Sequence, residues 1–144
     1  MLGFIMALVA GAAMSFQGVM NTRLSEKIGL LESNAYVQGT AFLLSAVALA
    51  LFGKGQLQSL FSANWLYLLG GVLGLVITVT VMLSIQGLTP TVAISTILIS
   101  QLFSAALIDA MGILGAEKAP FIWQKWLGLA LMVGGVVLMK LKSN

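Results

Sequence analysis

The stretch from Thr91 to Gly112, TVAISTILISQLFSAALIDAMG, indicates the class of this protein. Its 22 residues would form a helix about 33 Å long at about 1.5 Å per residue, enough to cross the hydrocarbon core of a bilayer. The stretch nevertheless contains Gln101 near its midpoint and Asp109 farther along. A carboxylate inside a membrane costs about 2.5 to 3.5 kcal/mol on insertion scales, so it usually faces protein or water. We therefore expect the rest of the chain to form walls around this helix.

The composition of the whole chain agrees with a membrane protein. Of its 144 residues, 60% are hydrophobic and 8% are charged, whereas soluble domains contain about 25% charged residues. The mean hydropathy is +1.07. The first apolar run has no preceding Lys or Arg and continues past the AxA-like pattern in ALVAGAA, so we expect a retained span and not a cleaved signal.

Several classes of chemistry are disfavoured by residue content. The chain has no cysteine and no histidine, which removes thiol chemistry, disulfides and the usual zinc or haem ligands. Its four acidic residues assemble no catalytic dyad or triad. The net charge of +3 is scattered and predicts no nucleic-acid surface. We expect no enzyme, no metal and no cofactor.

Five apolar runs are predicted to cross the membrane, with short polar connections between them. They are Leu2–Met20, Ala35–Phe52, Trp65–Gln86, Val92–Gly112 and Trp123–Met139. No connection is long enough to form a separate soluble domain. The prediction is an all-α polytopic membrane protein with five transmembrane helices, forming a single domain over residues 1–144.

Polar side chains inside these spans indicate a candidate substrate path. If side A is the side of the N-terminus and side B the opposite side, most of the polar side chains lie toward side B, Gln101 near the midplane and Asp109 toward side A. A polar vestibule with apolar walls elsewhere is what a small-molecule pathway requires. The residues predicted to line it are Gln17, Asn21, Gln38, Ser95 and Gln101. The alternative is that these groups only bond one another, with Gln17 joining two helices and Asn21 capping the first.

Asp109 is the only acidic residue inside a predicted span. Desolvation disfavours its charged form, which suits a coupling or gating residue. The alternative is a structural role near the helix end, where Lys118 or Lys125 would hold the carboxylate as a fixed anion.

Glycines at intervals along three spans predict close helix packing, because small residues let backbones approach each other. They are Gly11 and Gly18 in the first span, Gly70, Gly71 and Gly74 in the third, and Gly134 and Gly135 in the fifth.

The basic residues give no clear orientation in the membrane. Side A receives Lys54, Lys118 and Lys125, and side B receives Arg23, Lys27, Lys140 and Lys142. Orientation follows an excess of Lys and Arg on one side, and this chain has almost none. Two oppositely oriented copies would form an antiparallel dimer. Many transporters contain two inverted repeats, and no internal repeat is visible here, so one chain is predicted to be a single repeat.

The order and spacing of several short motifs resemble those of the YdcZ-like family in the drug/metabolite transporter superfamily, a family of bacterial inner-membrane exporters. The first matching pieces are Gln17-xxx-Asn21-xx-Leu24, Tyr36-x-Gln38-Gly39 and Trp65-x-Tyr67-Leu68-x-Gly70-Gly71-xx-Gly74. The others are Gln101-Leu102, Ile108-Asp109, Gly112-Ile113-Leu114-Gly115, Trp126-Leu127-Gly128 and Gly134-Gly135-Val136.

This resemblance implies five spans, an antiparallel two-domain assembly and kinship with the four-span small multidrug resistance exporters. Those exporters use a titratable glutamate in the first span, where this chain has Gln17, so their proton-coupling mechanism does not carry over. We expect a multi-pass protein of the bacterial inner membrane that exports a small solute as an antiparallel homodimer, or with a homologous chain. The rivals are a passive dual-topology channel and a non-transporting assembly protein.

Overall fold

All regular structure is helical in the part of the chain that the computed structural model describes, residues 1–119 and 122–141. The long helices are α1 (Leu2–Ile28), α2 (Leu30–Phe52), α4 (Gly70–Gly87), α5 (Pro90–Met111) and α6 (Trp123–Leu141). Two short elements, the 3₁₀ helix η1 (Leu57–Ser62) and α3 (Trp65–Leu68), precede α4. Among the described residues, five segments are long and apolar enough to cross a membrane, with α3 and α4 together forming Trp65–Gly87. The predicted all-α class with five spans is confirmed.

The first predicted connection is wrong. Residues 21–34 were expected to form a polar loop, but α1 continues to Ile28 and α2 begins at Leu30, so only Gly29 separates the two helices. Arg23 and Glu26 form an ion pair of 3.0 Å within the last turns of α1, and such pairs support a helix beyond its apolar part. Gly29 has φ 104°, and a side chain there would collide with the Glu32 carboxylate, which is why the chain turns at this glycine.

The other helix ends follow ordinary capping rules. α5 begins two residues before the predicted Val92, because Pro90 occupies its first turn, where the fixed φ of proline suits a helix. It ends before Gly112, which has the left-handed φ of 65° that glycine adopts without a Cβ clash. The third span is not continuous, since Leu69 lies between α3 and α4. Lys142, assigned to side B, lies outside the described residues.

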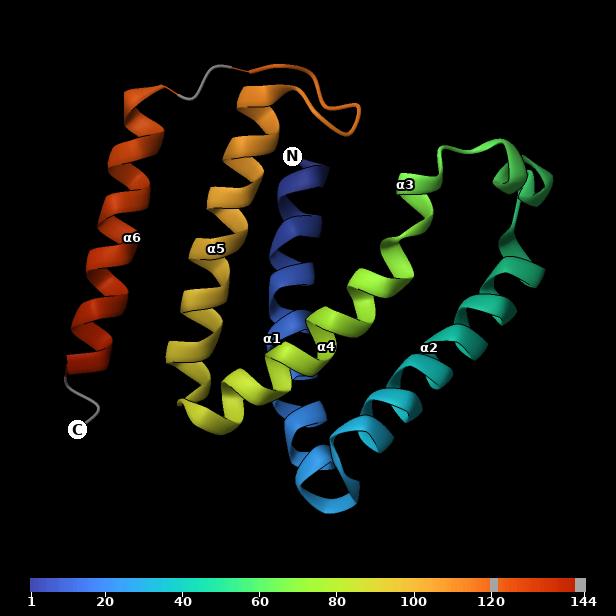
Figure 1. The fold of residues 1–144 in the computed structure, drawn as a ribbon, viewed down its shortest axis with the longest axis horizontal. Helices are drawn as coiled ribbons and strands as arrows, with labels where there is room; N and C mark the ends of the chain where they lie inside the picture. The colour runs from blue at the N-terminus through green and yellow to red at the C-terminus, as the bar shows by residue number, and fades with distance from the viewer. Residues whose placement is uncertain (120–121, 142–144) are drawn as a thin grey trace. The chain divides into compact units, whose positions relative to one another are not determined.

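The chain divides into two compact units, residues 1–86 and 87–144. In the first unit α1 and α2 form a helical hairpin, and α4 approaches α1 where Val81 and Ile85 surround Gly18. In the second unit α5 and α6 run side by side in opposite directions (Figure 1, yellow-orange and red).

Few side chains are buried, and the buried ones are not mainly apolar. Most large apolar side chains point outward, as expected where lipid is the solvent. In the first unit the buried polar residues gather at the α1–α2 hairpin; they are Asn21, Thr22, Ser25, Ser33 and Asn34. The buried side chains of this unit are therefore these polar groups together with Met82 and Ile85 of α4, whereas most large apolar side chains of α1 and α2 are exposed.

Candidate functional site

The first candidate region is the polar corner, which comprises the five buried polar residues of the α1–α2 hairpin and Gln86 of α4. The Ser33 hydroxyl donates a hydrogen bond to the Asn21 carbonyl oxygen at 3.2 Å, which ties α2 to α1. The Gln86 amide donates to the Ser25 Oγ at 2.9 Å, which ties the end of α4 to α1. Asn21 follows the first predicted span and Gln86 ends the third, and the structure brings their helices together at this corner.

One buried acceptor in the polar corner has no partner among the described residues. The Oδ1 of Asn34 is buried and accepts no hydrogen bond there. Leaving a buried acceptor unpaired costs about 1 to 3 kcal/mol, so this oxygen is available to a donor that is not part of the described chain, such as water or a solute. The sequence analysis missed Asn34 as a candidate because residues 21–34 were assigned to a loop. Gly29 is an isolated glycine between two helix-forming segments, and this pattern could have placed Asn34 in a helix.

The predicted path residues of the first unit differ in their surroundings. Asn21 is buried inside α1, seven residues before its last residue Ile28, so its interpretation as a helix cap is wrong. The Gln38 amide donates to the Thr78 hydroxyl at a long 3.4 Å, which connects α2 with α4. Gln17 is exposed and forms no side-chain hydrogen bond with another described residue, so the predicted bridge to a second helix is not observed.

The predicted packing glycines of the first unit differ in how closely another helix approaches them. An added Cβ at Gly18 would lie 3.1 Å from the Ile85 Cδ1 and 3.2 Å from the Val81 Cγ1, so this buried glycine is where α1 and α4 approach closely. A Cβ at Gly74 would lie 3.7 Å from the Gln38 Nε2, an ordinary contact. At the remaining predicted packing glycines, no other helix of the described chain comes within 4 Å of an added Cβ; they are Gly11, Gly70, Gly71, Gly134 and Gly135. Their packing role stays a prediction.

The second candidate region is a cavity of about 460 Å³ between α5 and α6, within the second unit. Asp109 and Lys125 line it together with apolar and small residues; these are Leu102, Ala105, Ala106, Gly128, Leu129 and Met132. Asp109 is partly buried and forms no ion pair with another described residue. Gln101, which is exposed, and Ser95, which is partly buried, are not among the residues that line the cavity.

Both charged residues that line this cavity lie at a helix end whose dipole has the same sign as their charge. Asp109 lies in the last turn of α5, near the negative end of the helix dipole, and Lys125 lies in the first turn of α6, near the positive end. Each charge is therefore on the unfavourable end of its own helix, where an opposite charge would contribute about 0.3 to 1 kcal/mol. The backbone holds the adjoining loop, because the Ala119 N–H donates to the Asp109 carbonyl oxygen at 2.9 Å. The side chain of Asp109 is not needed for that contact.

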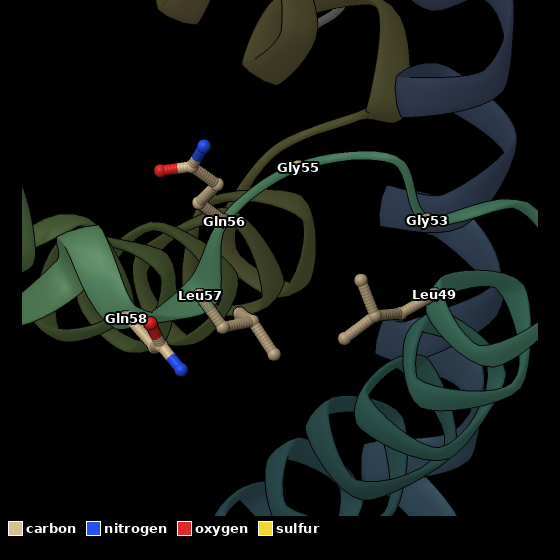
Figure 2. Close-up of a pocket in the computed structure, with 6 residues that line it drawn as sticks. All are labelled: Leu49, Gly53, Gly55, Gln56, Leu57 and Gln58. Atoms are coloured by element: carbon tan, nitrogen blue, oxygen red, sulfur yellow. The ribbon is translucent and has the colours of Figure 1, made fainter.

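A third hollow, of about 470 Å³, lies where α2 passes into the segment before η1. Figure 2 shows Leu49 and Leu57 facing each other across it, while the side chains of Gln56 and Gln58 project to its sides. None of the six described residues that line it is charged. Among the described residues, this hollow beside the segment between α2 and η1 has no group that could couple or select a charged solute.

Comparison with known proteins identifies the family. Residues 2–138 match the family described as "Putative inner membrane exporter, YdcZ". No curated protein and no solved structure matches the chain. The family match extends over all five candidate membrane helices, apart from the last residues of α6. The chain therefore belongs to the YdcZ family and is a multi-pass protein of the inner membrane.

Proposed function

We propose that this chain is one half of an exporter that moves a small solute across the inner membrane by alternating access. The observation that supports the proposal most directly is the partly buried carboxylate of Asp109 in a cavity between two membrane helices of a chain from an exporter family. An ionisable residue at membrane depth is costly and usually belongs to a substrate, ion or proton pathway. Asp109 acts as the coupling or gating residue.

Polar side chains of the membrane helices are proposed to face the substrate path. Gln17 and Gln101 are exposed in their membrane helices, and an amide that faces lipid loses its hydrogen bonds with water. Such side chains are favoured where they face a solvated path or a second chain. Asn21, Gln38 and Ser95 add further polar groups to the path. The unpaired Oδ1 of Asn34 offers an acceptor to a solute or to water in the polar corner.

The second half of the exporter is another copy of the chain in the opposite orientation, or a homologous chain. Many transporters place their substrate site between two inverted repeats, and one chain of this length supplies a single five-helix repeat. The balanced Lys and Arg content permits both orientations.

The transport proposal is tested with purified protein in liposomes that contain a trapped pH indicator. Addition of small organic solutes from a panel should produce solute-dependent proton flux in vesicles with protein and none in vesicles without it. A passive channel would instead conduct without any coupling ion. A non-transporting assembly protein would give vesicles indistinguishable from empty ones, and either result would contradict the proposal.

The dimer proposal makes a separate prediction about orientation. The chain has no cysteine, so Gly55→Cys and Ile28→Cys each introduce a single exposed thiol, one on each predicted side, without changing the Lys and Arg balance. With equal insertion in both directions, a membrane-impermeant maleimide added outside intact cells should label about half of each variant. Permeabilised cells, in which both should be labelled completely, provide the control. Full labelling of one variant and none of the other would show a single orientation and exclude the antiparallel homodimer.

A further inference from the structure

The hydroxyl groups of the polar corner have no proton left for the buried acceptor of Asn34. A hydroxyl group carries one O–H, and Thr22, Ser25 and Ser33 each donate it to a main-chain carbonyl oxygen of α1. The distances are 2.8 Å for Thr22, 2.7 Å for Ser25 and 3.2 Å for Ser33. The Oδ1 of Asn34 is buried among them and accepts no hydrogen bond from a described residue.

The amide groups of the corner do not supply this donor either. The Gln86 Nε2 donates to the Ser25 Oγ at 2.9 Å, and no N–H of Gln86 or Asn21 reaches the Asn34 Oδ1. Main-chain N–H groups inside a helix donate to the carbonyl oxygen of the preceding turn, and Asn34 lies in the second turn of α2. A donor for this oxygen therefore has to come from outside the described chain.

The buried residues of the corner restrict the charge of that donor. All five buried polar residues are uncharged, whereas the charged residues of the hairpin are exposed; these are Arg23, Glu26, Lys27 and Glu32. Arg23 and Glu26 already pair with each other at 3.0 Å. A cation among uncharged buried groups would bear a large desolvation cost without a counter-charge, and a neutral donor avoids this cost.

The position of the corner makes it accessible to molecules dissolved in water. The apolar part of α1 ends near Met20, directly before Asn21. Asn34 is four residues into α2, about 6 Å along the helix axis from Leu30. The corner is therefore at an end of the membrane helices, and a small donor reaches it without crossing the apolar part of the bilayer.

We propose that the polar corner binds a small neutral hydrogen-bond donor, whose O–H or N–H donates to the Asn34 Oδ1. Such a donor pairs a buried acceptor that would otherwise lower the stability of the hairpin. Two sources have this chemistry: a water molecule, or the hydroxyl or amide group of a solute that the exporter selects. Only the second source rests on the proposed function.

The first measurement is the density of the whole protein in nanodiscs without added solute, at a resolution that shows ordered water. We expect a peak about 2.5 to 3.0 Å from the Asn34 Oδ1, the usual distance between two oxygen atoms that share a proton. Asn34→Leu removes the acceptor and should lose this peak, while ordered waters elsewhere stay in place. A peak that persists in Asn34→Leu would contradict the proposal.

The second measurement is the binding of three neutral amides, followed by fluorine NMR. Trifluoroacetamide and N-methyltrifluoroacetamide carry N–H donors, and N,N-dimethyltrifluoroacetamide carries none. For a solute site we expect both N–H amides to bind about 10-fold more tightly than the dimethyl amide, and Asn34→Leu to abolish this preference. Gln124→Leu is the matched control, because it removes an exposed amide from α6 and should bind as the wild type does.

The two measurements together identify the source of the donor. A peak without Asn34-dependent binding of the amides identifies water, and Asn34-dependent preference for the N–H amides identifies a solute. Absence of both would overturn the inference. If Asn34→Leu does not fold, the wild-type density and the order of the three amides still decide. An occupied corner in a protein that transports nothing would refute only the proposed export, whereas flux with neither a peak nor binding would refute only this site.

Discussion

Asp109→Asn is expected to reduce pH-dependent transport in liposomes at least about 10-fold while the protein remains folded. The substitution keeps the shape of the side chain and removes its ability to gain and lose a proton. The charged groups near this site are Lys125 of α6, which lines the same cavity, and Lys118 of the following loop, which lies beside Gly112. Neither can take over the coupling role proposed for the Asp109 carboxylate, so the response of transport to pH should flatten across the whole range.

The stability of this variant separates a coupling role from a structural one. The Asp109 carboxylate lies near the negative end of the α5 dipole, so its neutralisation should leave the free energy of unfolding unchanged or raise it by up to about 1 kcal/mol. Glu117→Gln is the matched control, because it removes an exposed acid from the adjoining loop and should change neither transport nor stability. Full pH-dependent flux in Asp109→Asn would show that Asp109 is not the coupling residue, and a loss of folding would show that its role is structural.

Gly18→Leu is expected to lower the free energy of unfolding by about 1 to 3 kcal/mol, because it overpacks the contact between α1 and α4. The first side-chain carbon alone would lie 3.1 Å from the Ile85 Cδ1 and 3.2 Å from the Val81 Cγ1, and leucine adds three further carbons to this tight contact. The separation of α4 from α1 should also strain the hydrogen bond between Gln86 and Ser25. Unfolding of the purified protein in mixed detergents, followed by tryptophan fluorescence, measures the loss.

The control for this variant lies on the same helix. Gly11 has nothing within 4 Å of an added Cβ, so Gly11→Leu should change the free energy of unfolding by less than about 0.5 kcal/mol. Gly18→Ala should fall between the two, since the nearest contact is the flexible tip of Ile85. Equal stability of Gly18→Leu and Gly11→Leu would mean that α1 and α4 do not approach at Gly18.

The sequence predicted the spans well and their ends poorly, for a physical reason. Hydropathy predicts which side chains lie in the apolar part of the membrane. It correctly indicates that the apolar part of α1 ends near Met20. Whether the backbone continues as a helix depends instead on helix-forming residues and local pairs, such as Arg23 with Glu26. The polar residues of 21–34 were therefore assigned to a loop, although glycine occupies the only position that breaks the helix.

The candidate sites were predictable only in part, because each depends on which residues face each other. Asp109 stands out in the sequence as an acid within an apolar run. Its association with Lys125 in one cavity depends on how tightly α5 and α6 pack and on the small residues between them, which hydropathy does not report. Similarly, the contact of Gly18 with α4 could not be distinguished from the open surroundings of Gly11, because both glycines fit the same spacing pattern.

The single-residue break at Gly29 has a consequence for the order in which the first unit folds. The bond from Ser33 to Asn21 joins residues twelve positions apart, so it can form as soon as the ribosome has delivered both helices of the hairpin. The bond from Gln86 to Ser25 joins residues 61 positions apart and must wait until α4 has been synthesised. Local contacts form faster than distant ones because less chain entropy is lost in closing them. We therefore expect the α1–α2 hairpin to form before α4 packs against it, and the Ser25 hydroxyl to gain the Gln86 hydrogen bond last.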